Sequence, residues 1–486
     1  MAAAVAAKKV GRDLTQGPIW KSLMLFAMPI VLANLIQQLY SMVDLMIIGQ
    51  FVGNVGTVGV NTGGEIADFL TPVATAFASA GQIYIAQLAG AKRFNDQKKA
   101  TGTFITLMMV ASLVLMVLTV VLTTPILRML NCPEEAMGEA TSYMIITAIG
   151  LPFIFGYNAV CGVLRGMGES KRPLLFIIIA AAVNIVLDIL LVAVIPLSAA
   201  GTAIATVISQ FASFAASFVY MYKRRETFDF ELKLRYFNFD PEHTKVLLQL
   251  GLPQAVRSIL VRVSMLWVNA NINACGSIAS GTNGIGNKLQ KFLEMFSSSM
   301  SQASAAMVGQ NLGAKKQDRA RKAVISTLLT SLAFGALISA LILLFPKQTF
   351  GIFTIDAQVE ALGVFYVQML AVHIMVSSVT SSYQSMVLGA GSATLNFIIG
   401  VLDGVICKIG LSVLFVNLFL NAAPETFSMW TGMSAFAESG LELTQFLKTQ
   451  AYFWGTGLSR VLPAVVCMIY FYTGAWKKKK LLKDAK

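Results

Sequence analysis

Two carboxylates and an amide occur in segments that are apolar enough to cross a membrane. The stretch RPLLFIIIAAAVNIVLDILLVAVIP carries Asn184 and Asp188, and the first apolar segment of the chain carries Asp44. Four residues along an α-helix leave a net rotation of about 40°, so Asn184 and Asp188 share one face, a turn apart. An ionised carboxylate inside a bilayer is costly and is functional by default. These three groups are therefore the first candidates for a binding site.

Depth in the membrane places these groups in one layer. Asp44 lies about nine residues before Gly53, and Asp188 lies eight before Pro196, which puts both roughly 12–14 Å below the same surface. Thr206 lies at a similar depth in the following segment. Carboxylate, amide and hydroxyl oxygens in one layer suit shared protons or a hard cation such as Na⁺, and the residues alone favour neither. The alternative is that the two carboxylates are separate structural residues that only form hydrogen bonds.

Composition indicates a membrane protein. Hydrophobic residues make up 56% of the 486 residues and charged residues only 13%, which leaves too little polar surface for a soluble protein. The net charge of +13 does not indicate nucleic-acid binding, because the basic residues lie between the apolar segments. No H-E-x-x-H, G-x-S-x-G or P-loop motif is present, and the five cysteines are scattered singly. We therefore expect neither an enzyme nor a resident cofactor.

The chain contains twelve apolar segments, each about 20 residues or longer, which is the length that spans the hydrocarbon core. The expected all-α membrane protein therefore has twelve transmembrane helices. The segments are 19–50, 57–84, 101–124, 140–163, 173–195, 200–222, 244–274, 281–308, 323–346, 360–387, 393–419 and 450–473.

Basic residues alternate between the connections. The connections on one side of the membrane hold only Arg128, Lys347 and Lys448. By the positive-inside rule the other, basic side is cytoplasmic, so both termini lie in the cytoplasm of a multi-pass protein of the cytoplasmic (inner) membrane. The N-terminus has no long apolar core ahead of a cleavage site, so we expect no removable signal peptide. The basic groups lie at 8–21, 92–99, 165–172, 223–245, 315–322 and 477–486.

The chain repeats itself. AQLAGAKRFNDQKKA at 86–100 matches GQNLGAKKQDRARKA at 309–323, and Pro29 recurs as Pro253. Since each repeat holds six segments, both repeats enter the membrane in the same orientation, as two pseudo-symmetric six-helix bundles. The cleft between such bundles is the usual place for a transported substrate. The expected parts are an N-terminal bundle at 1–222, a cytoplasmic linker at 223–243, a C-terminal bundle at 244–473 with an outer insertion at 421–449, and a basic cytoplasmic tail at 474–486.

The two repeats differ in chemistry. Cys407 and Leu411 take the places of Asn184 and Asp188, so the carboxylate cluster belongs to the first half alone. The insertion at 421–449 is expected to lie on the bundle or at the membrane interface, with an external lid as the alternative. Its aromatic and acidic residues are Glu425, Phe427, Trp430, Phe436, Glu438, Glu442 and Phe446.

Charged residues also occur inside segments of the second half. Arg257 and Arg262 are five residues apart, about 140° around a helix, so they do not line one face together. We expect one of them to pair with Glu294 and the other to extend to the cytoplasmic end, with contact to an anionic substrate as the alternative. Asp403 and Lys408 are expected to be members of internal ion pairs.

Together these features resemble the multidrug and toxic compound extrusion (MATE) family, and Asp44 with N-x-x-x-D at Asn184 and Asp188 resembles its DinF-like prokaryotic branch. The resemblance implies a V-shaped, twelve-helix efflux antiporter that exports organic cations or drugs in exchange for H⁺ or Na⁺. It further implies a cation or proton site, two neighbours of the substrate cavity and a bend in the first helix. The implied cation or proton site consists of Asp44, Asn184, Asp188 and Thr206. The implied neighbours of the substrate cavity are Tyr143 and Asn158, and the implied bend lies at Pro29.

A second class of function stays open. A lipid-linked saccharide flippase of the same superfamily would share the twin bundles, and Arg257 and Arg262 would suit its pyrophosphate headgroup. The expected partners are small organic cations or drugs and membrane lipids, without nucleic acid, and the expected state is a monomer.

Overall fold

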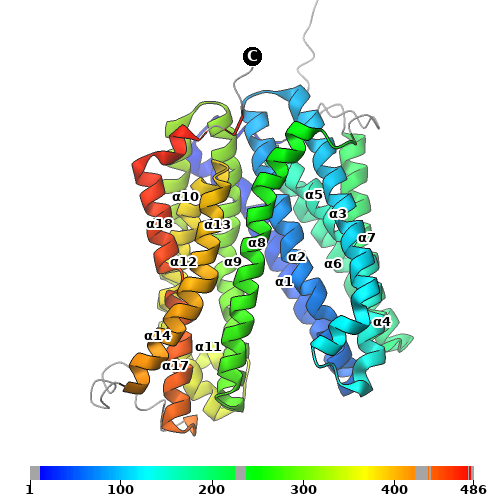
Figure 1. The fold of residues 1–486 in the computed structure, drawn as a ribbon, viewed down its shortest axis with the longest axis vertical. Coiled ribbons are helices and arrows are strands. Elements are labelled where there is room, and N and C mark those ends of the chain that lie inside the picture. Colours follow the sequence, from blue (N-terminus) through cyan, green and yellow to red (C-terminus); the bar gives the residue numbers. More distant parts are fainter. Residues whose placement is uncertain (1–10, 225–236, 422–435, 437–438, 480, 483–486) are drawn as a thin grey trace, which may run out of the picture. The chain divides into compact units, whose positions relative to one another are not determined.

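The computed structural model describes residues 11–224, 237–421, 436, 439–479 and 481–482. Within these ranges every regular element is a helix (Figure 1). Long helices follow from the apolar segments, because a chain inside lipid must satisfy its backbone hydrogen bonds within each segment. The helices end where glycine, proline or basic residues interrupt the apolar runs, as at Gly53 (φ +72°) between the first two helices.

The first half of the chain forms seven α-helices, with a short 3₁₀ turn (η1) and a π-helical segment (η2) between them. Two predicted segments are each built from more than one element: the fourth from α4 and α5, and the fifth from α6 and η2. The elements are α1 (Ile19–Phe51), α2 (Gly53–Gly90), α3 (Phe94–Met129), η1 (Glu134–Ala136), α4 (Met137–Ile149), α5 (Leu151–Gly166), α6 (Lys171–Asp188), η2 (Ile189–Val194) and α7 (Ser198–Lys223).

The described part of the second half repeats this pattern, including a π-helical segment (η4) inside the eleventh predicted span. The elements are α8 (Pro241–Asn273), α9 (Ser277–Gly313), α10 (Gln317–Leu344), α11 (Pro346–Gly351), α12 (Ala357–Gly389), α13 (Ala393–Val401), η4 (Leu402–Ile409), α14 (Gly410–Asn421), α17 (Leu443–Leu458), α18 (Val461–Thr473) and η5 (Ala475–Lys478).

Eleven of the twelve predicted spans are long and apolar enough to cross a membrane within the described residues. The remaining one, predicted at 281–308, lies in α9, which is a helix of 37 residues. Its many serine, asparagine and glutamine side chains lower its hydropathy, although its length is sufficient. Polar side chains in such a helix are tolerated when they face other helices.

The chain divides into two compact units, each with its own packing. Met1–Ala255, Ala305–Ala320 and Lys480–Lys486 form the first unit, and Val256–Ser304 and Arg321–Lys479 form the second. In the first unit, α2 packs on α4 and α5, and α6 packs on α1 and α7. In the second, α12 packs on α17 and α18 around a core rich in aromatic side chains.

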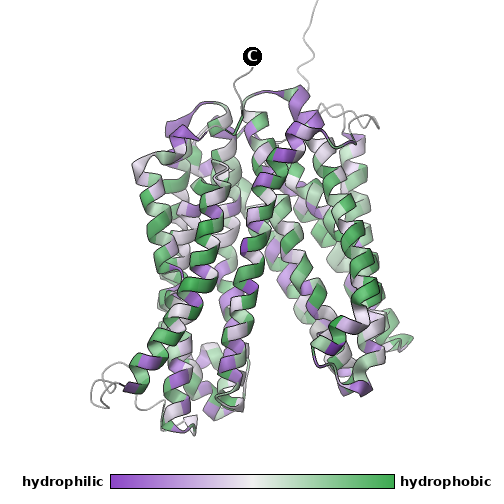
Figure 2. Cartoon of the chain, in the orientation of Figure 1, coloured by the Kyte–Doolittle hydropathy of each residue, from purple (hydrophilic) through white to green (hydrophobic). Residues whose placement is uncertain are grey.

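The surface of α3 shows how the protein meets lipid. Large apolar side chains are exposed along one stripe at helical spacing, whereas Ser112, Thr119 and Thr123 are buried on the opposite side. Such a continuous exposed apolar stripe fits contact with a bilayer rather than with water. Figure 2 shows hydrophilic residues concentrated at helix ends and connections. The exposed stripe is Val110, Leu113, Val114, Val117, Leu118 and Val121.

Within the first unit, the repeated glycines form a reciprocal contact. A Cβ atom on Gly90 would lie 1.9 Å from the carbonyl oxygen of Gln310, and a Cβ on Gly313 would lie 2.1 Å from that of Gln87. Gly90 and Gly313 are equivalent in the repeat, and so are Gln87 and Gln310. The ends of α2 and α9 therefore meet backbone to backbone, which only glycine permits at these positions.

Part of the predicted outer insertion is described. Phe436 and Phe446 pack together with ring centroids 5.2 Å apart, and both contact the core of the second unit. This contact agrees with an insertion that lies on the helices. Of the other predicted residues, Glu425, Phe427, Trp430 and Glu438 lie outside the described residues. Parts of the predicted linker and of the basic tail also lie outside them.

Candidate functional site

Asp44 and Asp188 face each other inside the first unit. Each carboxylate lies within hydrogen-bonding reach of the other. Asp188 is fully buried, Asn184 is 2% exposed and Asp44 is half-buried. The depth argument placed these side chains in one layer, and the structure brings the two carboxylates together.

The buried face of α6 explains this position. Its buried residues recur every three or four positions and end at Asp188, so the acidic group continues the face that packs inward. Because α1 packs against α6, the same face is turned toward Asp44. Immediately after Asp188 the chain changes to the π-helical segment η2, a form often found at functional sites. The buried residues are Pro173, Phe176, Ala180, Ala181, Asn184 and Asp188.

The oxygens of this cluster lack donors. Among the described residues, none donates a hydrogen bond to the buried Oδ1 of Asp44, Oδ1 of Asn184 or either carboxylate oxygen of Asp188. Carboxylates only accept hydrogen bonds, so two of them placed together need a proton or a cation between them. An all-oxygen donor set suits Na⁺ as well as protons. No group of three or more His, Cys, Asp or Glu side chains that could hold a metal ion occurs in the described part of the chain.

Two tyrosines lie close to the acidic pair. Tyr143 on α4 lies within electrostatic range of Asp44, Asp68 and Asp188, and its ring packs against the backbone of α2 at Gly63. Tyr40 lies one turn before Asp44 on α1 and within range of its charge. The resemblance indicated Tyr143, but the sequence reasoning missed Tyr40 and Asp68. The four-residue spacing of Tyr40 and Asp44 on one helix was the available signal for Tyr40.

Three other predicted residues have less contact with the pair. Thr206 on α7 makes no hydrogen bond to the acidic residues within the described ranges, and its backbone oxygen accepts from Ser209. The amide of Asn158 donates to the backbone oxygen of Ile154 at 2.8 Å. Pro29 lies inside α1, which continues on both sides of it. The roles of Thr206, Asn158 and Pro29 stay predictions.

The second unit contains a separate buried network of charges. Glu294 on α9 bonds the ring of His373 on α12, and its second oxygen lies 3.4 Å from Arg460. His373 is 1% exposed, and its other ring nitrogen lies 3.0 Å from the backbone oxygen of Gly457. Arg460 also bonds Ser377. The network therefore joins three of the helices of this unit.

Of the two arginines considered as partners of Glu294, Arg257 does not form that pair. Arg257 lies 3.9 Å from Asp403 instead, because Arg460 and His373 already occupy Glu294. Asp403 also lies 3.9 Å from Arg460, which confirms it as a member of an ion pair. Lys408 was expected to be another member, yet it forms no ion pair with any described residue.

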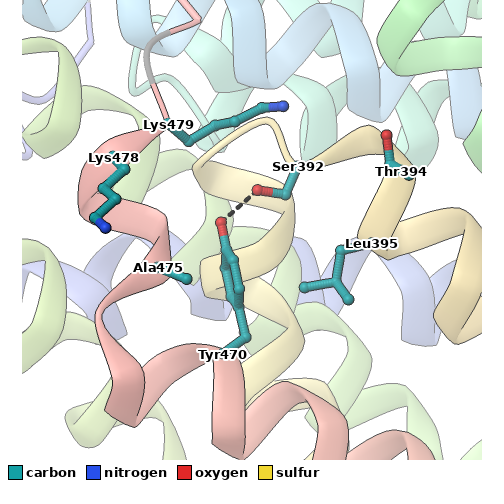
Figure 3. Close-up of a pocket in the computed structure, with 7 residues that line it drawn as sticks. All are labelled: Ser392, Thr394, Leu395, Tyr470, Ala475, Lys478 and Lys479. Atoms are coloured by element: carbon teal, nitrogen blue, oxygen red, sulfur yellow. Dashed lines mark hydrogen bonds between the residues drawn. The ribbon is translucent and has the colours of Figure 1, made fainter.

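An open pocket lies at the end of the second unit near the C-terminal lysines. Figure 3 shows Lys478 and Lys479 at its rim, with a hydrogen bond between Ser392 and Tyr470 at its wall. Thr394, Leu395 and Ala475 complete the lining. Basic side chains in such a place suit contact with an anionic membrane surface.

Comparison with known proteins agrees with this arrangement. A model of the MatE family matches residues 29–190 and 253–414, which begin 224 residues apart (253 minus 29), so each half of the chain matches. The probable multidrug resistance protein YoeA of Bacillus subtilis is 30% identical over 345 residues, or 70% of this chain and 74% of that protein. The multidrug export protein MepA of Staphylococcus saprophyticus is 22% identical over 399 residues, or 82% of this chain and 87% of that protein.

Solved structures show the same fold. A crystal structure of MATE in the bent conformation matches with a TM-score of 0.85 over 97% of this chain and 99% of that chain, at 18% identity. An outward-facing multidrug resistance MATE transporter matches with a TM-score of 0.84 over the same shares, also at 18% identity. The expected all-helical, twelve-helix fold is thereby confirmed. Because the family match covers both halves and most of its length, the chain belongs to the MATE family of membrane transporters.

Proposed function

We propose that this protein is a secondary multidrug exporter that moves organic cations or drugs across the cytoplasmic membrane in exchange for H⁺ or Na⁺. Relatives named as multidrug resistance or export proteins support the export of drugs. The pair formed by Asp44 and Asp188 supports the coupling to a cation, because three of its carboxylate oxygens are buried without a donor in the described part of the chain. This pair is the observation on which the proposal depends.

Charge balance gives a physical reason for exchange. Two ionised carboxylates in a buried space repel each other and have lost their hydration, so the empty, doubly charged pair is costly. A proton, a sodium ion or a cationic substrate each lowers that cost. If the site is most stable when one of them is bound, release of a substrate on one side is favoured by capture of an ion there. On the other side of the membrane, release of the ion is likewise favoured by capture of a substrate, and this completes the cycle.

Helix α1 offers a way to link ion binding to a change in shape. It carries Asp44 and also Pro29, which has no N–H group and leaves the carbonyl of Leu25 without its helical partner. Because α1 packs on α6, a change in the charge between Asp44 and Asp188 alters the contact of these two helices. We propose that α1 bends at Pro29 as the ion binds or leaves, and that the bend opens the site alternately to the two sides.

Nothing in the described residues favours the flippase alternative. That alternative relied on Arg257 and Arg262 as contacts for a pyrophosphate group. Arg257 instead pairs with Asp403 within the second unit, and Arg262 also has partners inside the protein. The proposal therefore keeps export of organic cations, by a monomer with both termini in the cytoplasm.

Transport by purified protein in liposomes tests the proposal. Gradients of Na⁺ and of pH are imposed independently, and the movement of a fluorescent organic cation is followed. Asp44→Asn and Asp188→Asn should each reduce gradient-driven transport to the background rate, because each removes a charge that the ion neutralises. The gradient that drives the wild-type protein identifies the coupling ion.

A matched control is Asp318→Asn, which changes an exposed aspartate at the start of α10 and should transport at the wild-type rate. All variants are compared at equal amounts of reconstituted protein. Wild-type transport by both Asp44→Asn and Asp188→Asn would exclude the coupling site. Transport that responds to neither gradient would exclude antiport with H⁺ or Na⁺.

A further inference from the structure

The second unit encloses a small polar cavity that the proposed exchange does not use. Its lining comes from α8, α9, α12, η4 and α17, and is completed by apolar groups such as Met369 and Phe453. The polar residues that line it are Asn269, Asn283, Asn287, Tyr366, Lys408 and Thr456.

Lys408 is the unusual member of this lining. Its exposed fraction is only 7%, and its ammonium group makes no hydrogen bond or ion pair with any residue in the described ranges, although its backbone oxygen accepts from Ser412. Lysine is almost never fully buried unless it is paired, and the cost is higher inside a membrane. A charged group in this position therefore requires a partner that the described residues do not supply.

The charges around Lys408 do not balance. Glu294, Asp403 and Arg460 lie within electrostatic range of Lys408. Glu294 is occupied by Arg460 and His373, while Asp403 is shared between Arg257 and Arg460. Two carboxylates thus face two arginines, and the ammonium of Lys408 is the excess charge of this cluster.

The other polar groups of the lining can donate hydrogen bonds. Asn283 and Asn287 both donate to Oδ1 of Asn269, at 2.8 and 3.2 Å. This arrangement leaves the NH₂ group of Asn269 as a donor for another group. The hydroxyl of Thr456 is buried and has no partner in the described part of the chain. An ammonium, an amide N–H and a hydroxyl together suit an anion.

The size of the cavity limits the occupant. About 10 Å³ is accessible to the centre of a water-sized sphere, which holds about one water molecule or one ion of similar size. A carboxylate carried on an organic molecule does not fit such a space. We propose that this cavity binds a monatomic anion of the size of chloride, held by Lys408, Asn269 and Thr456. The proposal is independent of which ion drives transport.

The internal repeat allows this anion site to be compared with the equivalent segment of the first half. Cys407 takes the place of Asn184, so Lys408 takes the place of Ile185, one turn before Asp188 in the first half. The equivalent helical segments of the two halves therefore carry charges of opposite sign, although at different positions. In the first unit, acidic oxygens lie together and suit a cation. In the second unit, hydrogen-bond donors lie together and suit an anion, and a lysine stands where the first half has an aliphatic residue.

Thermal unfolding of the detergent-purified protein tests the anion site. The midpoint is measured in sodium chloride, sodium bromide and sodium gluconate at equal ionic strength and pH. Chloride and bromide should raise the midpoint relative to gluconate by about 3 °C, because a ligand that binds only the folded state stabilises it. In Lys408→Met the difference between the salts should disappear. In Lys347→Met, which changes an exposed lysine on α11, it should persist.

Crystals of the wild-type protein grown in bromide provide a second readout that does not depend on the folding of a variant. Anomalous scattering from a bromide ion is expected beside Nζ of Lys408. An equal midpoint in all three salts would overturn the proposal, as would a salt effect that survives in Lys408→Met. A crystal that diffracts well but shows no anomalous peak in this cavity would overturn it too.

Discussion

At the scale of single residues, the candidate site depends on oxygen atoms that have no donor. Asn184 contributes one of them, and it is 2% exposed. Its position, one turn before Asp188, follows directly from the sequence spacing. Contact between Asn184 and the acidic pair depends on how α6 is rotated about its axis. The stripe of buried residues on α6 sets that rotation. The amide is therefore expected to act as a neutral ligand beside two charged ones.

Asn184→Ala should weaken ion binding without abolishing transport. The loss of one neutral oxygen ligand to a cation costs about 1.5 kcal/mol, or about a tenfold loss of affinity. The concentration of the coupling ion that gives half-maximal transport in liposomes should therefore rise about tenfold, with an unchanged maximal rate. Asn61→Ala, on an exposed position of α2, should leave both quantities unchanged. A wild-type concentration dependence in Asn184→Ala would remove Asn184 from the site.

At the scale of helices, charge networks decide how the second unit packs. Arg460, between α17 and α18, is in contact with Glu294 on α9 and Asp403 on η4. These residues are far apart in sequence, and no spacing rule links them. The pairing of Arg257 with Asp403 rather than Glu294 shows the same point. Hydropathy identifies each helix, but it does not say which partner a charged side chain meets.

Arg460→Met should strongly destabilise the second unit. It removes the positive charge between the half-buried Glu294 and the buried Asp403, and breaking a buried pair costs up to about 3–5 kcal/mol. The thermal unfolding midpoint in detergent should fall clearly. Glu294→Gln added to Arg460→Met should restore part of the loss, because one unpaired charge is then removed.

The exposed Arg128 at the end of α3 provides the control for this change. Arg128→Met should have a midpoint within error of the wild type, since an exposed charge contributes little. A midpoint for Arg460→Met equal to that of Arg128→Met would show that the network does not stabilise the unit.

At the scale of the whole molecule, the repeat organises the chain. The family match falls on both halves with a constant offset, and the repeated glycine–alanine–lysine turns follow α2 and α9. Within the first unit the equivalent residues Gly90 and Gly313 each approach the other helix. A contact made reciprocally by equivalent residues is what a two-fold relation between repeats produces.

Gly90→Ala and Gly313→Ala should each destabilise the protein, and by similar amounts. The added Cβ would lie about 2 Å from a backbone oxygen in both cases, so α2 and α9 must separate, at a cost of about 1–3 kcal/mol or more. Thermal unfolding and size-exclusion chromatography measure the effect. Gly138→Ala is the control, because nothing lies within 4 Å of its added Cβ. If the alanine variants at 90 and 138 were equally stable, the close contact would be excluded.

The amino-acid sequence alone was enough to predict a membrane protein, its helical spans and its internal repeat, and to propose Asp44, Asn184 and Asp188 as a candidate site. These features are local, because hydropathy, helical spacing and depth depend only on residues near one another in the chain. The eighth predicted span, in α9, illustrates the limit of hydropathy, since its polar side chains face other helices.

Only the tertiary structure determined which of these groups meet. It brought Asp44 within reach of Asp188, added Tyr40 and Asp68 to the surroundings of the pair, and left the ammonium of Lys408 without an ion pair among the described residues. The physical reason is that contact between helices depends on how each one rotates and packs, and this is set by the sum of many small side-chain contacts. A sequence pattern defines the face of one helix, but not the neighbour that covers it.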